Sequence, residues 1–381
     1  MSIKILIISH SLNRTGAPLA LLQLIRSRPL NLDMEISLLG LRNNDLENDF
    51  KKYIDKIEII VPNPSKNNFI DLMQRILAIP SIVKFIIKVK PNVILVNSAA
   101  NSRALLIVKL LQKVFSYRII LYIHEFEEMF RYFKFLRKKT LLLADRALIV
   151  SYDQYDWLRK EIKYLKNVTL VPNAIDNKLI KEYIKYEPEE NFLNFKNKYK
   201  FLITNIGMMN YRKGLDLFIK IITSLENQNQ DLGFVIIGDF ANMSEKKTFF
   251  KSLENYNLDR RVYITGFQNN IFKYLKYSDL TAITSRSETF SRVALESMAV
   301  GKPVVAFNIK GLKSTLPMGY PYLAKCFDIA EFSKYVLNIK NLNSEDLNIL
   351  QNELIMHSSK FDIEIISKQF WNIFVEYMKD S

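Results

Sequence analysis

The stretch that decides the fold is residues 279–307, DLTAITSRSETFSRVALESMAVGKPVVAF. An apolar run, Leu280–Thr284, ends in a polar loop that carries Glu288. A helix-length amphipathic segment, Arg292–Ala299, follows, and a Gly-Lys-Pro turn leads into a second apolar run, Val304–Phe307. This order of strand, loop, helix and strand is typical of an α/β sheet with parallel strands.

Two glutamates of this stretch, Glu288 and Glu296, stand where such sheets bind ligands. In open α/β sheets, ligands bind beyond the carboxyl ends of the strands, where helices begin. A carboxylate suits sugar hydroxyls, and the free N–H groups at a helix start suit a phosphate. Glu296 lies among apolar neighbours such as Leu295 and Met298, so we expect it to be buried and to need polar partners. The stretch therefore predicts a site for a nucleotide-sugar.

Similar apolar runs alternate with amphipathic segments along the whole chain. They are rich in β-branched residues and mostly lack polar alternation, as parallel strands covered on both faces do. The pattern βαβα occurs twice, so we expect an α/β protein of two doubly wound, Rossmann-like domains. The other predicted strands are Ile3–Ser9, Glu35–Leu39, Ile57–Val61, Asn92–Val96, Arg118–Ile123, Ala147–Ser151, Val168–Val171, Phe201–Ile206, Phe234–Ile237 and Val262–Thr265.

The polar segment 174–199 predicts the break between the two domains. We therefore expect an N-terminal domain over residues 1–176 and a C-terminal domain over residues 177–362. The last segment, Ile363–Met378, reads as an amphipathic helix. Its predicted apolar side consists of Ile365, Ile366, Phe370, Ile373, Phe374 and Tyr377.

Bulk composition limits the class of protein. A chain of 381 residues is too long for one ordinary core, and 49% hydrophobic residues exclude disorder. A single cysteine, Cys326, excludes an intramolecular disulfide and fits a reducing cytosol. No stretch reaches the roughly 18 uncharged apolar residues that a membrane span needs. We therefore expect a cytoplasmic protein that is soluble or attached to a membrane surface.

The net charge of +15 is unevenly distributed. Residues 1–176 hold 27 Lys and Arg against 16 Asp and Glu, a balance of +11, whereas the remaining residues hold 27 against 23, a balance of +4. This asymmetry favours an anionic partner for the first half, either nucleic acid or anionic lipid, although a solvated basic surface would give the same counts.

The segment Arg212–Lys213–Gly214 follows a predicted strand and begins a helix. Two cations at a helix N-terminus form an anion site, although a charged surface loop is the simpler interpretation. If a nucleoside diphosphate leaves during the reaction, its growing negative charge needs such preorganised cations. The sequence contains neither an Asp-x-Asp pair nor a Cys/His cluster, so we expect no metal site.

In the first half, Gly16 lies in the loop Asn13–Pro18, after the first strand. A tight turn close to a phosphate would need this glycine. His124 follows the strand Arg118–Ile123 at its carboxyl end, and it is one of three histidines in the chain. A lone histidine is more often structural than catalytic, so its position carries the prediction. The carboxylates just after it, at 125 and 127–128, are candidates for contact with an acceptor hydroxyl.

Several ordered motifs resemble the GT4 group of retaining glycosyltransferases. Glu288 and Glu296 match its E-x7-E motif, and 203–217, ITNIGMMNYRKGLDL, is similar to its strand, glycine loop and Arg-Lys-Gly helix start. The segments at 171–176 (VPNAID), 234–239 (FVIIGD) and 262–267 (VYITGF) occur in the same order as in the group. The resemblance covers the second half well, and it covers the first half more loosely, through Gly16, His124 and Ser151.

This resemblance implies a GT-B fold, with two domains facing a central cleft and a helix at about 363–381 packing back on the first domain. It implies that Lys213, supported by Arg212, takes the phosphate charge, that Glu288 contacts the transferred sugar and that Glu296 contacts the ribose. Many members carry Arg directly after the glycine of the strand, where this chain has Met208, so Arg212 would replace that cation.

The remaining implied roles belong to loops around the donor. His124 would orient the transferred sugar from the first domain. The amides of Ser291 and Arg292 would hold the distal phosphate, although Ser291 is equally plausible as a helix N-cap. The other implied donor contacts are Gly16, Gly266, Phe267 and Phe290.

The implied activity is retaining transfer of a sugar from a nucleotide-sugar, with a UDP-sugar preferred, to a glycan or lipid-linked acceptor in bacterial surface polysaccharide synthesis. The donor is a substrate, so no cofactor is implied. The segment Met129–Lys139 mixes five cations with aromatics. Such a helix suits an anionic membrane surface, which would place the protein on the inner face of the cell membrane, or it packs its aromatics into the core.

Particular residues bear on five alternative functions. An inverting GT-B glycosyltransferase and a sugar-nucleotide epimerase differ from the preferred function in the anomeric configuration or identity of the product. A catalytically silent nucleotide-sugar-binding scaffold is disfavoured by the presence of Lys213, Glu288 and Glu296. A dehydrogenase would need G-x-G-x-x-G after a strand, which the chain lacks. No recognisable nucleic-acid-binding module is present, so we expect no nucleic-acid partner.

Overall fold

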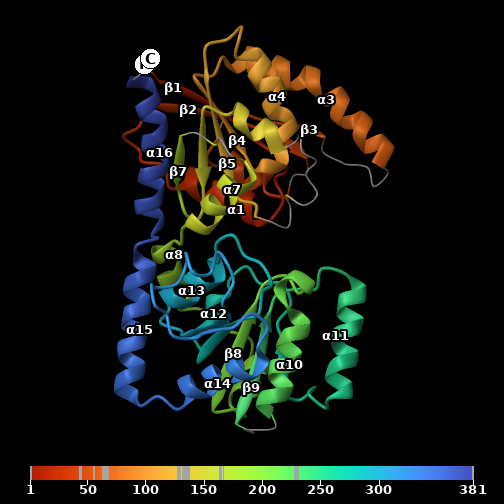
Figure 1. Ribbon diagram of the computed structural model, residues 1–381, viewed down its shortest axis with the longest axis vertical. Helices are drawn as coiled ribbons and strands as arrows, with labels where there is room; N and C mark the ends of the chain where they lie inside the picture. Colours follow the sequence, from red (N-terminus) through yellow and green to blue (C-terminus); the bar gives the residue numbers. More distant parts are fainter. Residues whose placement is uncertain are drawn as a thin grey trace. The chain divides into compact units, whose positions relative to one another are not determined.

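The computed structural model describes residues 2–42, 45–54, 56–61, 68–126, 130, 138–162, 165, 167–226 and 231–379, with the backbone alone at 61, 68–78, 378 and 379. The chain forms two compact units. Unit 1 comprises Met1–Ala174 and Ile363–Ser381, and unit 2 comprises Ile175–Asp362. Each unit is an α/β structure built on a parallel sheet (Figure 1), so the expected fold class is confirmed.

Unit 1 contains a seven-stranded sheet in the order β3-β2-β1-β4-β5-β6-β7, and neighbouring strands are all parallel. The buried residues of its central strands are almost continuously aliphatic, because helices cover both faces. The strands are β1 (Ile3–Ser9), β2 (Met34–Arg42), β3 (Lys56–Val61), β4 (Val93–Asn97), β5 (Arg118–Ile123), β6 (Arg146–Ile149) and β7 (Val168–Leu170).

One hydrophobic core of unit 1 lies between the sheet and the helices α3 and α4. Ile86 and Leu105 of these helices pack there with Leu6 and Ile94 of the strands. The helical elements of the unit are α1 (Gly16–Arg26), α2 (Glu47–Lys51), α3 (Asn68–Val89), η1 (Ala99–Asn101), α4 (Ser102–Leu111), η2 (Thr140–Leu143), α7 (Tyr152–Glu161) and α16 (Ile363–Lys379).

The C-terminal helix α16 packs against α1 in unit 1. Trp371 Nε1 donates to Leu24 O at 2.9 Å, and Ser367 Oγ donates to Ser27 O at 2.7 Å. The predicted apolar side is wrong at Ile365, which is 55% exposed, because Trp371 occupies the buried face instead. The indole has the larger apolar surface and also finds a hydrogen-bond acceptor there.

Unit 2 contains a six-stranded parallel sheet in the order β10-β9-β8-β11-β12-β13. Its strands are β8 (Phe201–Ile206), β9 (Leu232–Ile237), β10 (Val262–Ile264), β11 (Leu280–Ile283), β12 (Val304–Phe307) and β13 (Leu323–Ala324). Its helical elements are α8 (Asn177–Tyr183), α9 (Glu190–Lys196), η3 (Tyr211–Lys213), α10 (Leu215–Glu226), α11 (Met243–Asn255), α12 (Phe272–Leu275), α13 (Arg292–Ala299), α14 (Ile329–Lys340) and α15 (Ser344–Ser359).

The polar segment 174–199 belongs to unit 2 from Ile175 onward and contains α8 and α9. The two places where the chain passes between the units are neighbours, because Ile175 N donates to Phe361 O at 3.0 Å. No helix in the described part of the chain is long and apolar enough to cross a membrane.

Each sheet has one point where the strand order reverses. In unit 1 this switch point lies between β1 and β4, and in unit 2 it lies between β8 and β11. Loops from neighbouring strands leave in opposite directions at such a point, which makes the carboxyl edge of the sheet the place where α/β folds bind ligands. The sequence-predicted residues Lys213 and Glu288 follow β8 and β11, the two strands that flank the switch point of unit 2.

Candidate functional site

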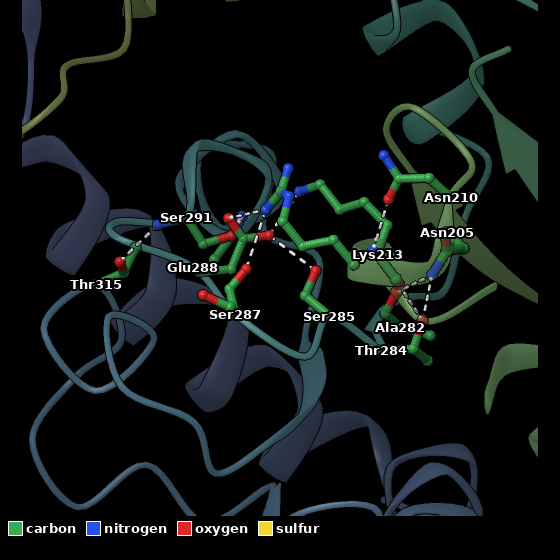
Figure 2. A network of polar contacts seen from close by, with 12 residues as sticks. Asn205, Asn210, Lys213, Ala282, Thr284, Ser285, Ser287, Glu288, Ser291 and Thr315 are labelled. Atoms are coloured by element: carbon green, nitrogen blue, oxygen red, sulfur yellow. Dashed lines mark hydrogen bonds and ion pairs between the residues drawn. The ribbon is translucent and has the colours of Figure 1, made fainter. Parts of the chain in front are cut away.

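The loop after β8 is shaped by backbone that approaches the neighbouring strand closely. Gly214 has φ +70°, and a Cβ added there would lie 2.0 Å from Thr284 O, so only glycine fits. The side chain of Asn210 caps the short helix η3 by accepting from Lys213 N at 2.9 Å. Thr284 Oγ1 donates to Lys213 O at 2.9 Å and ties the loop to the end of β11 (Figure 2).

Lys213 and Glu288 form the centre of the site in unit 2. Lys213 Nζ lies 2.5 Å from Glu288 Oε1, and Ser285 Oγ donates to the same oxygen at 2.8 Å (Figure 2). Arg212 Nη1 lies 3.8 Å from the other carboxylate oxygen and donates to Ser287 O at 3.0 Å. Both predicted cations therefore face the predicted carboxylate across the switch point.

The charge state of Glu288 follows from this network. Burial raises the pKa of its carboxyl, because its side chain is only 9% exposed. The charges of Lys213 and Arg212, with hydrogen bonds from Lys213 and Ser285, outweigh burial and hold the pKa below its ordinary value. Glu288 is therefore ionised at neutral pH, and its two cationic neighbours are fixed in place before a ligand arrives.

Glycine also makes room for the lysine. A Cβ on Gly207, at φ +139°, would lie 3.3 Å from Lys213 Cε. A Cβ on Gly238, at the end of β9, would lie 2.0 Å from Gly207 O. The ends of β8 and β9 consequently approach so closely that the Lys213 side chain extends along bare backbone.

Helix α13 begins at the other side of Glu288. Ser291 is its N-cap, and its Oγ accepts from Ala294 N at 3.3 Å. The amide of Ser291 donates to Thr315 Oγ1 at 3.0 Å, so this predicted phosphate donor is already engaged (Figure 2). Phe290 is buried, with its ring centroid 5.4 Å from that of Phe361. The Phe290 side chain therefore belongs to the packing beneath the helix.

Glu296 pairs with Arg292 one turn earlier on α13. Arg292 Nη2 lies 3.2 Å from Glu296 Oε1, and the Glu296 side chain is 16% exposed. Burial raises the pKa of the Glu296 carboxyl, and the charges of Arg292 and Lys213 offset this only in part. Arg292 Nε is buried and has no hydrogen-bond partner among the described residues. Glu296 thus has less electrostatic support than Glu288 and would gain from further hydroxyl donors.

Gly266 and Phe267 follow β10, two strands from β8. Gly266 has φ +69° and its carbonyl accepts from Gly238 N at 3.0 Å, which places the loop beside the end of β9. Phe267 is 61% exposed. An exposed aromatic ring at the carboxyl edge of a sheet offers a flat surface on which a nucleobase stacks.

In unit 1, His124 lies at the end of β5 in a partly buried, polar environment. Its Nε2 is 3.0 Å from Asn97 Oδ1, and its ring centroid is 4.0 Å from that of Tyr122. Burial, with the nearby His10, lowers the pKa of His124 to about 3. The imidazole is therefore uncharged at neutral pH and serves as a hydrogen-bonding group.

Glu125 is occupied within unit 1. Its carboxylate accepts from Ala99 N at 2.9 Å and His124 N at 3.1 Å, and Ser98 Oγ also donates to it. These bonds hold the turn after β4 against the end of β5. The other two candidate carboxylates, at 127–128, and all of Met129–Lys139 except 130, 138 and 139 lie outside the described residues.

The backbone reason given for Gly16 is wrong. Gly16 has no positive φ, and a Cβ added there would meet nothing within 4 Å. It is exposed at the start of α1, beside the switch point of unit 1. The turn itself therefore does not require glycine, and the open space remains available to a ligand.

Sequence reasoning missed several polar residues that shape the sites. Ser285 and Thr315 contact the Glu288 loop, but no spacing in the sequence links Thr315 to a helix cap 24 residues earlier. His10, at the end of β1, was also missed. Its Nδ1 is buried without a partner among the described residues. Its position directly after the first strand was the available signal.

The structure thus brings Arg212, Lys213 and Glu288 into one network, with Arg292 and Glu296 on the adjoining helix and Gly266 and Phe267 two strands away. In unit 1 it places Gly16 after β1 and His124 after β5, linked through Asn97 of β4 to the switch point. Within the described part of the chain, no three His, Cys, Asp or Glu side chains gather as metal ligands.

Comparison with known proteins agrees with this geometry. Residues 187–354, nearly all of unit 2, match the family described as glycosyl transferases group 1. An uncharacterized glycosyltransferase of Methanocaldococcus jannaschii is 26% identical over 86% of this chain and 89% of its own length. The UDP-Gal:alpha-D-GlcNAc-diphosphoundecaprenol alpha-1,3-galactosyltransferase of Escherichia coli is 25% identical over 46% of this chain and 43% of its own.

The fold is also that of solved glycosyltransferase structures. HepE of Anabaena, solved in complex with UDP-glucose, superposes with a TM-score of 0.76 at 18% identity, covering 100% of both chains. The two parallel-sheet units therefore form a GT-B fold. This fold, together with the match of residues 187–354 to the group 1 family, supports the interpretation of the protein as a GT-B glycosyltransferase.

Proposed function

We propose that the protein transfers a sugar from a nucleotide-sugar, a UDP-sugar first among them, to a glycan or lipid-linked acceptor with retention at the anomeric carbon. The observation that carries this proposal is the network of Arg212, Lys213 and Glu288 at the switch point of unit 2. It puts two cations beside a carboxylate at the place where a pyrophosphate and a sugar would meet. The UDP-glucose held by HepE supports the choice of donor.

Each residue has a proposed task in this reaction. Lys213 and Arg212 stabilise the charge that develops on the leaving diphosphate, which makes a metal ion unnecessary. Glu288 accepts hydrogen bonds from hydroxyls of the transferred sugar. Glu296 accepts from the ribose, which supplies the donors that its buried carboxylate lacks. His124, held neutral, offers a hydrogen bond to the sugar without adding charge.

The loops around this network complete the proposed donor site. Phe267 stacks on the base, and Gly266 allows its loop to approach. Gly16 leaves room at the start of α1. Because the Ser291 amide already donates to Thr315, the proposed phosphate contact at α13 falls to the Arg292 amide. Phe290 supports this turn from below. For the acceptor, the diphosphoundecaprenol in the name of the galactosyltransferase relative supports a lipid-linked glycan. Similarity to an O-antigen biosynthesis glycosyltransferase of Escherichia coli supports a role in bacterial surface polysaccharide synthesis.

A screen of nucleotide-sugars by thermal shift tests the donor. UDP-glucose, UDP-galactose, UDP-N-acetylglucosamine and GDP-mannose are compared with UDP alone, because a ligand that binds only the native state raises the melting temperature. We expect a UDP-sugar to raise the melting temperature most. We also expect the protein to hydrolyse this donor slowly in the absence of an acceptor. The K213A variant should lose the shift, whereas K220A, an exposed lysine on α10, should keep it.

The stereochemistry of the product separates the remaining activities. Proton NMR of the transferred sugar distinguishes a retained from an inverted anomeric centre. Conversion of the donor to another nucleotide-sugar without an acceptor would instead identify an epimerase. Tight binding of a donor with no turnover under any acceptor would favour the silent scaffold.

A further inference from the structure

The helices α3 and α4 of unit 1 form one layer on a single face of the sheet (Figure 1). Both pack inward on the same hydrophobic core, through residues such as Phe85 and Ile86 of α3 and Ala104 and Leu105 of α4. They also contact each other. Their outward sides consequently make up one continuous surface, which we call the α3–α4 face.

A row of apolar side chains lies on this face. Leu106, Leu110 and Val114 are 47%, 66% and 75% exposed, and their spacing of four residues places them one above another along α4 and its end. Ile87 on the outward side of α3 is 46% exposed. Single exposed leucines are common, but an ordered row of branched aliphatic residues indicates a surface that meets something apolar.

The charged side chains that the structure describes on α3 and α4 are all basic. Residues 72–124 contain eight Lys and Arg and neither Asp nor Glu. Besides Arg118 at the start of β5, five of these cations are exposed, and none of the five forms an ion pair within the described part of the chain: Lys84, Lys88, Lys90, Arg103 and Lys113. The unpaired charge therefore surrounds the apolar row instead of being neutralised by the protein itself.

This combination selects one occupant. A second copy of the chain would bring the same positive face and be repelled in a two-fold contact. An acidic protein would satisfy the cations, but a lipid interface satisfies both features together, because hydrocarbon lies just below the anionic headgroups. We propose that the α3–α4 face docks on an anionic lipid bilayer. Leu106, Leu110 and Ile87 enter the headgroup boundary, and the lysines reach the phosphates.

The proposal locates membrane contact on residues other than Met129–Lys139. It does not depend on the proposed function, because it rests on a surface outside the candidate sites. Vesicle co-sedimentation of the full chain tests it directly. The vesicles contain phosphatidylcholine alone or with about 30% phosphatidylglycerol. Binding is measured at about 20 mM salt and at about 500 mM salt, and the higher concentration screens most of the electrostatic attraction to the surface. We expect binding to the anionic vesicles at low salt and strong loss at high salt.

Two matched pairs of variants identify the face. L106S/L110S should lower the partition coefficient by about tenfold or more, whereas I349S/M356S, which alters two similarly exposed residues of α15, should not. K88E/K113E should lower it by about 25-fold or more, since each basic residue near an anionic surface contributes roughly fivefold. K247E/K251E on α11 provides the charge control. All four changes are on exposed side chains, and circular dichroism with a melting curve checks each fold.

Several results would overturn the proposal. These are no sedimentation of the wild type with anionic vesicles at low salt, equal binding to neutral vesicles, or wild-type binding by L106S/L110S and K88E/K113E. A dimer in analytical ultracentrifugation that L106S/L110S dissolves, without vesicle binding, would assign the face to a second copy. Donor turnover measured on the same preparations keeps the two proposals apart, because lipid binding without turnover leaves this one intact.

Discussion

The carboxyl edges of the two sheets have similar strand orders but different charged groups. At the switch point of unit 2, Lys213 lies 2.5 Å from the carboxylate of Glu288, with Arg212 nearby. At that of unit 1, His124 is neutral and Glu125 is consumed by backbone and hydroxyl donors. One fold thus provides one edge whose cations would suit a diphosphate and another edge whose neutral histidine would suit hydroxyls. We expect the loop residues, and not the sheet, to determine which ligand each edge accepts.

The largest effect should come from removing the central cation. K213A leaves the buried Glu288 carboxylate with the Ser285 hydroxyl and with one cation, Arg212, at 3.8 Å. We expect donor turnover to fall by about 10³-fold, in the range found when a preorganised charge partner is lost. Stability should fall by about 3–5 kcal/mol, because a buried carboxylate loses its close partner. Urea unfolding and initial rates measure the two effects, with K220A as the control.

That result bears directly on the contrast between the edges. The double variant K213A/E288Q should recover most of the lost stability, because the unpaired charge is gone, but not the activity. Recovery of activity as well would mean that Lys213 only neutralises the charge of Glu288, and it would contradict the tasks proposed for both residues.

The next effect compares one glycine from each edge. In G214A the new Cβ would lie 2.0 Å from Thr284 O, so the loop that carries Lys213 must move. We expect the free energy of unfolding of G214A to fall by about 2–4 kcal/mol. Activity should fall as well, because Lys213 is displaced. In G16A the Cβ meets open space, so stability should change by less than about 0.5 kcal/mol. Thermal unfolding of both variants distinguishes the backbone requirement from a ligand requirement. If G16A loses activity at full stability, a ligand lies close to that helix start.

At Glu296 we expect two smaller changes of opposite direction, a gain in stability and a loss of UDP affinity. Burial raises the pKa of this carboxyl in the folded state, so the unfolded state releases its proton first as pH rises. Glu296 therefore costs stability above its unfolded pKa, and the cost disappears at low pH. E296Q should melt at a slightly higher temperature than the wild type at pH 7 and at the same temperature near pH 4. Its affinity for UDP should fall about tenfold, since a ribose hydroxyl loses an ionised acceptor. Calorimetry at both pH values measures both effects, and higher UDP affinity in E296Q would contradict the assignment.

The last effect is absent at neutral pH and concerns the pH dependence of unit 1. The pKa of His124 is lowered to about 3 in the folded state, whereas the unfolded side chain titrates near its ordinary value of 6.5. The unfolded state therefore binds more protons in between, so stability is full above pH 6.5 and declines as pH falls toward 3. H124Q, which keeps a donor for Asn97, should flatten this decline. Urea midpoints between pH 7 and pH 4 measure it, and an unchanged slope would show that another group titrates.

Much of this arrangement was predictable from particular residues. Runs such as Ile3–Ser9, Arg118–Ile123 and Val304–Phe307 have the predicted bounds, because buried parallel strands leave nearly uninterrupted aliphatic sequences. The sequence did not predict β13 of unit 2, because this strand has only two residues and therefore no periodicity of its own. Short elements of this kind are defined by their partner strand.

The candidate site was predictable where chemistry is local in sequence. Arg212, Lys213, Glu288 and Glu296 could be identified from their positions after strands. The bond from the Ser291 amide to Thr315 could not, because it depends on how a distant loop folds back over α13. Ile365 was misplaced for a related reason, since periodicity alone does not tell which of two apolar neighbours a partner helix selects.

The ion pair between Lys213 and Glu288 has a consequence for selectivity among anions. An incoming ligand must compete with a counter-ion that is already in contact with the ammonium group. Chloride or a single phosphate group offers too little charge and too few contacts to displace it. A ligand that carries a diphosphate and sugar hydroxyls offers a new partner to each residue. The diphosphate would bind the ammonium group of Lys213, and the hydroxyls would donate to the released carboxylate of Glu288. The unliganded protein would thereby bind small monovalent anions weakly, and its affinity for a ligand would rise strongly with the charge of that ligand.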